Sequence, residues 1–155
     1  MSRKARLAAL LYGAAAAVYL VDRITKALAE HYLRGRSGVV LIPRVLSLDY
    51  TTNSGGAFGL FGGQPWLFFA ATVGVSLVIV AFSPRVGSRP AAVGLGMILG
   101  GALGNLTDRI INGPGVSGPV TDFIHIHLWP VFNVADSSIV IGAAVVVLAG
   151  ARRGK

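Results

Sequence analysis

The chain has 155 residues, 54% of them hydrophobic and only 13% charged, and it carries a formal net charge of +8. A mean hydropathy of +0.69 is too high for a soluble domain, and the lack of cysteine excludes disulfides, thiolate catalysis and cysteine-ligated metals. No aromatic residues are interleaved with the basic clusters, as a base-stacking surface requires, so we do not expect nucleic-acid binding.

Four apolar stretches are long enough to cross a hydrocarbon core of roughly 30 Å, which takes about 20 helical residues. They span approximately residues 7–26, 66–83, 91–109 and 131–150. The first is longer than the apolar region of a cleaved secretory signal, about 7–15 residues, so we interpret it as a retained helix. The sequence predicts an all-α membrane protein that forms a single domain over residues 1–155 and acts as a monomer.

Basic residues lie before the first stretch, between the second and third, and after the fourth, which is one side of the membrane for an even number of spans. These residues are Arg3, Lys4, Arg6, Arg85, Arg89, Arg152, Arg153 and Lys155. The positive-inside rule makes this side the cytoplasm. Both termini are therefore predicted to be cytoplasmic, and the connections at about 27–65 and 110–130 extracytoplasmic.

The long outer connection contains two candidate strands. The segment "RVLSLDYTT" (44–52) alternates apolar and polar residues with the period of a half-buried strand, and "GVVLIP" (38–43) precedes it. A small extracytoplasmic β-sheet is expected from them. The glycines of "NSGGAFGLFGG" (53–63) then indicate a turn that permits close approach of the backbone.

The third apolar stretch has Gly96, Gly100 and Gly104 at four-residue spacing. Small residues on one helix face let helices pack closely where lipid supplies no hydrophobic drive. We interpret these glycines as packing residues.

Several polar residues lie at the outer ends of the apolar stretches. Asp22 and Lys26 share a helix face and can pair, either as an interfacial ion pair with Lys26 snorkelling outward or as a pair that orients or contacts a ligand. Asn105 and Arg109 are also four apart, with Asp108 between them either in a structural role with Arg109 or in a role at the site. An amide at membrane depth needs partners and tends to face a polar cavity, so Asn105 is a candidate site residue.

Two acids lie close to the start of the fourth stretch. Asn133 and Asp136 have the spacing of a helix N-cap and an acid in the first turn. Capping does not explain Asp122, which lies in the segment that returns the chain to the same end. If helix packing brings Asp122 and Asp136 together, both cannot ionise readily, and one can activate water while the other protonates a leaving amine. An aspartyl hydrolase at the membrane surface is the favoured interpretation.

A metal site is not expected. His125 and His127 alternate with apolar residues and can project together, but their spacing matches no strong metal signature.

Five segments in order resemble the lipoprotein signal peptidases, the signal peptidase II family. They are "DRITK" (22–26), "NSGGAFG" (53–59), "GGALGNLTDR" (100–109), "VTDF" (120–123) and "FNVAD" (132–136). The resemblance implies four transmembrane helices, an extracytoplasmic β-cradle and an aspartic endopeptidase without cofactor. It further implies cleavage of prolipoproteins just before the diacylglyceryl-modified cysteine, at the outer face of the bacterial cytoplasmic membrane, and inhibition by globomycin-like cyclic peptides.

Carried over by motif, the resemblance makes Asp122 and Asp136 the catalytic dyad. The residues that would bind substrate or support the dyad are Asp22, Lys26, Asn53, Gly55, Asn105, Asp108, Arg109, Asn133 and Ala135. Two features depart from the family pattern: Gly56 replaces an alanine of the glycine-rich block, and the "HIHLW" segment (125–129) matches no family requirement.

Two other functions fit part of the pattern. A proton-coupled transporter also uses intramembrane acids, but its relay acids usually lie near the bilayer midplane between repeats, whereas these cluster at one interface. A noncatalytic assembly partner leaves Asn105, Asp122 and Asp136 unexplained.

Overall fold

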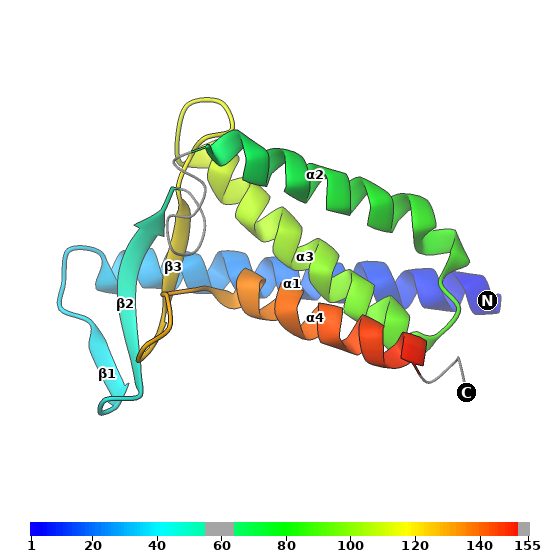
Figure 1. Cartoon of the computed structure of the whole chain (residues 1–155), viewed down its shortest axis with the longest axis horizontal. Coiled ribbons are helices and arrows are strands. Elements are labelled where there is room, and N and C mark those ends of the chain that lie inside the picture. The colour runs from blue at the N-terminus through cyan, green and yellow to red at the C-terminus, as the bar shows by residue number, and fades with distance from the viewer. Residues whose placement is uncertain (55–63, 152–155) are drawn as a thin grey trace.

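The computed structural model describes residues 1–54 and 64–151 as a bundle of helices with a three-stranded sheet at one end (Figure 1). The elements in chain order are α1 (Arg3–Leu33), β1 (Val39–Ile42), β2 (Leu46–Asn53), α2 (Pro65–Phe82), the short η2 (Ser83–Arg85), α3 (Arg89–Ile111), β3 (Val120–Ile126) and α4 (Val134–Ala151). Within the described residues, four helices are long and apolar enough to cross a membrane. The predicted fold class is confirmed. The N-terminus and the end of α4 lie at the end of the bundle opposite the sheet.

Helix α1 is longer than its apolar stretch. It continues beyond the predicted end near residue 26 to Leu33, so residues 27–33 of the predicted loop are helical. Ala29 and Leu33 are buried in one cluster with Phe123 of the sheet. The extra turns therefore form the support on which the sheet packs.

The sheet is antiparallel, with the order β1–β2–β3. The two strands expected in the long connection are present as β1 and β2, and Leu48 and Tyr50 pack against the cluster of Ala29 and Leu33. Strand β3 was not expected as a named strand. Its residues from Val120 to Phe123 are all buried, so it lacks the alternation that reveals a half-exposed strand.

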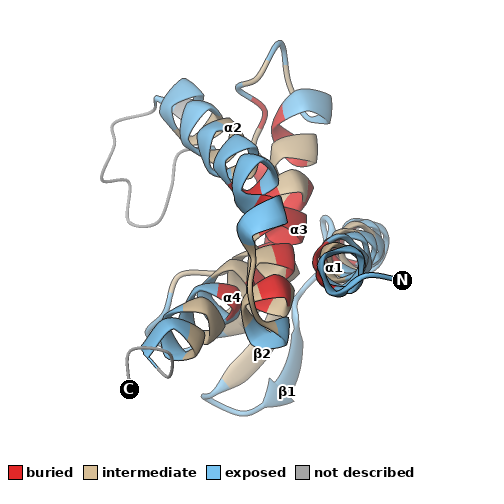
Figure 2. Cartoon of the chain, turned by 90° about the vertical axis from the view of Figure 1, so that its right-hand side faces the viewer, coloured by how far each residue is buried: buried red, intermediate tan, exposed pale blue. Residues whose placement is uncertain are grey.

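Helix α3 lies at the centre of the bundle and carries more buried residues than any other described helix (Figure 2). A Cβ on Gly100 would lie 2.9 Å from Cβ of Val18 in α1, and one on Gly101 would lie 2.9 Å from Cγ1 of Ile139 in α4. Glycines thus bring α3 against a neighbour on two of its faces. The predicted packing role of the four-residue glycine repeat is confirmed.

The contact between α3 and α4 gives a test of this packing. A Cβ on Gly142 of α4 would lie 2.6 Å from the carbonyl oxygen of Gly94, whereas one on Gly74 of α2 meets nothing within 4 Å. We expect Gly142→Ala to lower the free energy of unfolding by about 1–3 kcal/mol, because overpacking forces the helices apart. Gly74→Ala is the matched control and should not destabilise. Thermal unfolding in detergent checks both, and equal midpoints for the two variants would contradict the packing account.

Candidate active site

The start of α4 is held by a reciprocal hydrogen-bonded cap. The backbone N–H of Asp136 donates to Oδ1 of Asn133 at 2.9 Å, and the backbone N–H of Asn133 donates to Oδ2 of Asp136 at 3.3 Å. This is the geometry of a capping box, with Asn133 as N-cap and the acid at the third helical position. The predicted cap is confirmed, and it also fixes where the Asp136 carboxylate lies.

The other oxygen of Asp136 is held by α3. Nζ of Lys26 donates to Oδ1 of Asn105 at 2.8 Å. Because an ammonium group can only donate, this contact fixes the orientation of the Asn105 amide. Nδ2 of Asn105 then donates to Oδ1 of Asp136 at 2.8 Å. Each oxygen of the Asp136 carboxylate therefore accepts an N–H.

The second acid comes from β3. Asp122 is 2% exposed and pairs across the sheet with Thr51. Its Oδ1 accepts from Nδ2 of Asn133 at 2.7 Å, and the side chain of Asn53 donates to the same carboxylate. Since the Oδ1 of Asn133 is already taken by the backbone N–H of Asp136, its Nδ2 is free to donate to Asp122. One fully buried amide thus contacts both acids.

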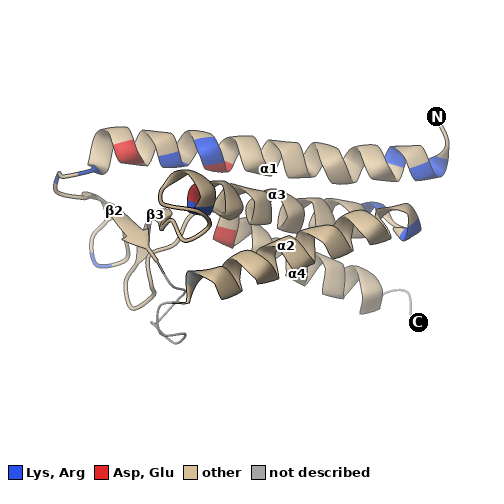
Figure 3. Ribbon diagram, turned by 90° about the horizontal axis from the view of Figure 1, so that it is seen from above, with Lys and Arg blue, Asp and Glu red and all other residues tan. Residues whose placement is uncertain are grey.

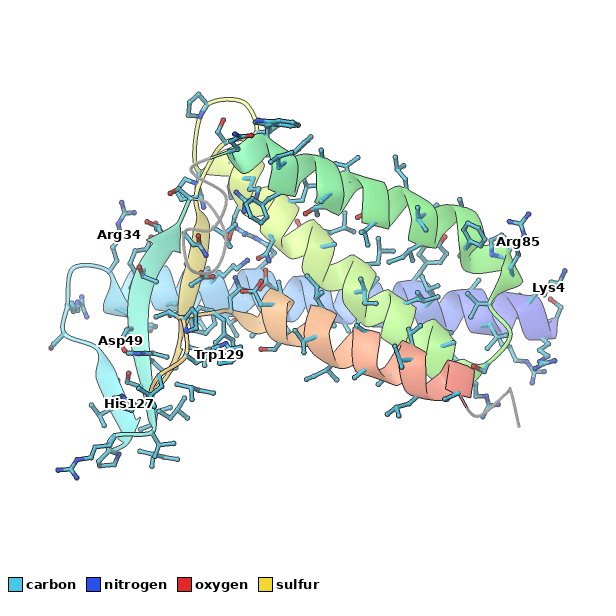
Figure 4. All side chains as sticks on the ribbon, viewed as in Figure 1. Lys4, Arg34, Asp49, Arg85, His127 and Trp129 are labelled. Carbon is cyan, nitrogen blue, oxygen red and sulfur yellow. The ribbon has the colours of Figure 1, made fainter. Side chains whose placement is uncertain are left out.

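Asp122 and Asp136 line one cavity of about 360 Å³ at the sheet end of the bundle. The polar part of the cavity wall is formed by Asn53, Asn105 and Arg109. The apolar part is formed by residues of α2, α4 and the connection between β3 and α4. That connection includes Trp129, labelled in Figure 4. A cavity with two carboxyl groups, amide donors and apolar walls suits the hydrolysis of a bond in a partly apolar substrate.

The surroundings of Asp122 favour its protonated form. Burial of the carboxyl and, after it, the negative charge of Asp136 raise its pKa to about 7. Hydrogen bonds from Asn133 and Asn53 and the charge of Lys26 lower the pKa only in part. A carboxyl that holds a proton near neutral pH is suited to act as a general acid.

A buried charge cluster lies behind the dyad. Nζ of Lys26 is 2.9 Å from Oδ2 of Asp22 and 3.0 Å from Oδ2 of Asp108, and Arg23 also pairs with Asp108. Lys26 is 2% exposed, so the outward-snorkelling interpretation is wrong. Oδ1 of Asp22 accepts the backbone N–H of Ala135 at 2.9 Å, which ties this cluster to the N-terminus of α4.

Of the two interpretations of Arg109, the structure favours a place at the site over an ion pair with Asp108. Its guanidinium carbon lies 5.4 Å from the ring centroid of Phe68 in α2, and the side chain lines the cavity. Its Nη1 is buried and has no hydrogen-bond partner among the described residues. The partners of Asp108 are instead Arg23, Lys26 and the backbone N–H of Thr121.

The two histidines lie away from the dyad, at the far part of the sheet. Nδ1 of His125 is 3.0 Å from Oδ2 of Asp49, which also accepts from Ser47, and His125 and His127 line a separate small cavity with β1 residues. The Ser47 and His125 contacts hold the pKa of the Asp49 carboxyl below its usual range. Among residues 1–54 and 64–151, no three metal-binding side chains gather.

The sequence interpretation missed some site residues. Arg23, Phe68 and Thr121 were not singled out, although a second cation directly after Asp22 at membrane depth was a usable signal for Arg23. Gly55 and the Gly56 departure fall outside the described residues.

Comparison with known proteins agrees with the fold. The family model for signal peptidase (SPase) II matches residues 14–152. The chain belongs to the signal peptidase II family. The lipoprotein signal peptidase of Rhodococcus jostii is 44% identical over 140 residues, which cover 90% of this chain and 71% of the relative. That of Halothermothrix orenii is 40% identical over 132 residues, covering 84% and 88%.

Two solved structures of bacterial membrane enzymes have the same fold as this signal peptidase II chain. One superposes with a TM-score of 0.80 at 28% identity and covers 92% of this chain and 87% of its own. The other has a TM-score of 0.75 at 29% identity and covers 88% of each chain. This member of the family is therefore a peptidase and a multi-pass bacterial membrane protein.

The raised pKa of Asp122 predicts how stability depends on pH. The folded chain holds this proton more tightly than the unfolded chain between the ordinary pKa of 3.8 and about 7. Stability is therefore expected to fall as the pH rises across that window, by at most about 4 kcal/mol at roughly 1.4 kcal/mol per tenfold change in proton affinity. Thermal unfolding in detergent at a series of pH values measures the slope.

Two variants test whether this pH dependence of stability is due to Asp122. Asp122→Asn should flatten it and raise the unfolding midpoint at the alkaline end, because the variant buries no charge there. Asp49→Asn is the control and should keep the Asp122 slope, since Asp49 lies at the exposed part of the sheet. An unchanged slope in Asp122→Asn would show that Asp122 does not hold the proton.

Proposed function

We propose that this chain is an aspartic endopeptidase that removes the signal peptide from prolipoproteins, cleaving on the N-terminal side of the diacylglyceryl-modified cysteine. The observation that carries the proposal is that Asp122 and Asp136 line one cavity and are both hydrogen-bonded by Asn133. The printed names of its relatives support the substrate class.

The proposed reaction needs only these two carboxyl groups and water. Asp136, whose oxygens each accept an N–H, acts as the ionised base that takes a proton from the attacking water. Asp122, protonated near neutral pH, donates a hydrogen bond to the scissile carbonyl oxygen and stabilises the tetrahedral intermediate. Collapse of the intermediate breaks the C–N bond as the dyad protonates the leaving amine. No cofactor is required.

The remaining candidate residues support the dyad in this proposal. Asn53, Asn105 and Asn133 hold the carboxylates, and Asp22, Lys26 and Asp108 hold the elements that carry them. Arg109 offers Nη1 to a backbone carbonyl of the substrate. Ala135, which is fully buried, supports the dyad by donating its backbone N–H to Asp22. Gly55, outside the described residues, belongs to the same proposed set. Globomycin-like cyclic peptides are expected to occupy the same cavity.

The depth of the site fits a lipid-anchored substrate. The cavity lies at the sheet end of the helices, where basic and acidic residues balance, whereas the described residues of the other end carry cations without acids, which the positive-inside rule places in the cytoplasm. The site then faces the outer leaflet, where a diacylglyceryl cysteine is held by acyl burial worth roughly 0.8 kcal/mol per methylene. We infer both termini to be cytoplasmic and the chain to act as one monomeric domain.

The dyad predicts the effect of two conservative substitutions. Asp122→Asn and Asp136→Asn should each lower cleavage at least about 10³-fold, because each removes a group that must gain or lose a proton. Purified protein in detergent, incubated with a diacylglyceryl-modified prolipoprotein, provides the assay through release of the signal peptide. Asp49→Asn is the matched control and should cleave normally. Parent-like turnover by either dyad variant would remove the proposal.

Chelation tests the metal-free reaction. A strong chelator added to the same assay should leave the cleavage rate unchanged, because the two carboxyl groups supply the proton transfers. A zinc peptidase treated in parallel shows that the chelator is effective. A rate that falls on chelation and returns with added metal would contradict the aspartic mechanism.

A further inference from the structure

A further cavity lies at the opposite end of the bundle from the dyad. It has a volume of about 400 Å³ and is lined by Arg3, Arg6, Leu7, Leu10, Ser88 and Arg89. These residues come from the first turns of α1 and from the start of α3. Nη2 of Arg3 donates to the carbonyl oxygen of Gly87 at 2.9 Å, which ties α1 to the connection before α3.

The charges at this end have no acidic side chain beside them in the part of the chain that the structure describes. All six acids lie toward the sheet: Asp22, Glu30, Asp49, Asp108, Asp122 and Asp136. That half also carries six cations, namely Arg23, Lys26, Arg34, Arg36, Arg44 and Arg109, and is therefore neutral. Among the described residues, the other end carries five cations, Arg3, Lys4, Arg6, Arg85 and Arg89, and no acid, as the distribution of red and blue in Figure 3 illustrates. An anion that neutralises them must come from outside the protein.

The walls of the cavity indicate what kind of anion fits. Three guanidinium groups suit a phosphate, which arginine binds through paired hydrogen bonds. Leu7 is buried, but Leu10 is 38% exposed on a membrane-spanning helix. A free phosphate gains nothing from contact with an apolar wall. A phospholipid, in contrast, can place its headgroup on the arginines and an acyl chain along the leucines.

We propose that this cavity binds the phosphate headgroup of an anionic phospholipid from the cytoplasmic leaflet. The leaflet follows from the orientation under the proposed function, but binding itself does not depend on peptidase activity. Basic loops are attracted to anionic membranes in general. The proposed binding is more specific, because the three arginines of the cavity contact the phosphate. Lys4 and Arg85, labelled at the same end in Figure 4, do not line it.

Two double variants of equal net charge distinguish binding in the cavity from general electrostatic attraction. Arg3→Gln with Arg89→Gln removes two cavity arginines, whereas Lys4→Gln with Arg85→Gln removes two cations outside the cavity. Native mass spectrometry of the purified chain with phosphatidylglycerol measures binding at physiological salt. We expect the first pair to weaken binding about tenfold or more and the second less than about twofold, since charges outside the cavity are screened. Phosphatidylcholine should bind the parent at least about tenfold more weakly than phosphatidylglycerol.

Further arms identify the ligand. Inorganic phosphate and glycerol phosphate, offered as competitors, should not displace the lipid at equal concentration; displacement would mean a site for a free anion and would overturn the lipid assignment. Equal weakening of lipid binding by both variant pairs would contradict the assignment of binding to the cavity.

Arg6→Gln, on an exposed side chain, repeats the test if the double variant does not fold. Prolipoprotein cleavage in detergent should stay at the parent rate in Arg3→Gln with Arg89→Gln, so failure of the lipid site leaves the peptidase proposal standing.

Discussion

One buried amide, Asn133, organises the site. Its Oδ1 accepts the backbone N–H of Asp136, its own N–H donates to the Asp136 carboxylate, and its Nδ2 donates to Asp122. The same residue ends the extended segment after β3 and begins α4. An acid on a strand and an acid on a helix are therefore placed together by the residue that joins the two elements, and the rest of the bundle serves to hold that junction.

The junction between β3 and α4 is held by charged side chains buried at membrane depth. Lys26, Asp22 and Asp108 are almost fully buried, and isolated charges there would cost several kcal/mol each. Their mutual pairing offsets the cost, and each partner also fixes something beyond the cluster: Asp22 holds the start of α4, Asp108 holds the start of β3, and Lys26 orients Asn105. Such a network is poor as a source of stability but well suited to positioning reactive groups.

The sequence predicted the four helices from their long apolar stretches, two of the strands and the cap. It also marked Asp122 and Asp136 as candidates to share a site, because acids are rare in an apolar chain, and both line one cavity. It could not reveal β3, whose buried residues do not alternate. It also could not tell whether Lys26 points to lipid or to protein, because spacing defines a helix face but not its neighbour. The partners of Asp108 depended on how α1 and α3 pack, which rests on close contacts at glycines.

The most direct test of the account is infrared spectroscopy of the carboxyl groups, since the chain has only six acidic side chains to assign. At a pH just below 7, the parent in detergent should show the C=O stretch of a protonated carboxylic acid, and Asp122→Asn should lose that band while Asp49→Asn keeps it. A parent spectrum with no protonated carboxyl, or a band that persists unchanged in Asp122→Asn, would contradict a dyad that shares one proton.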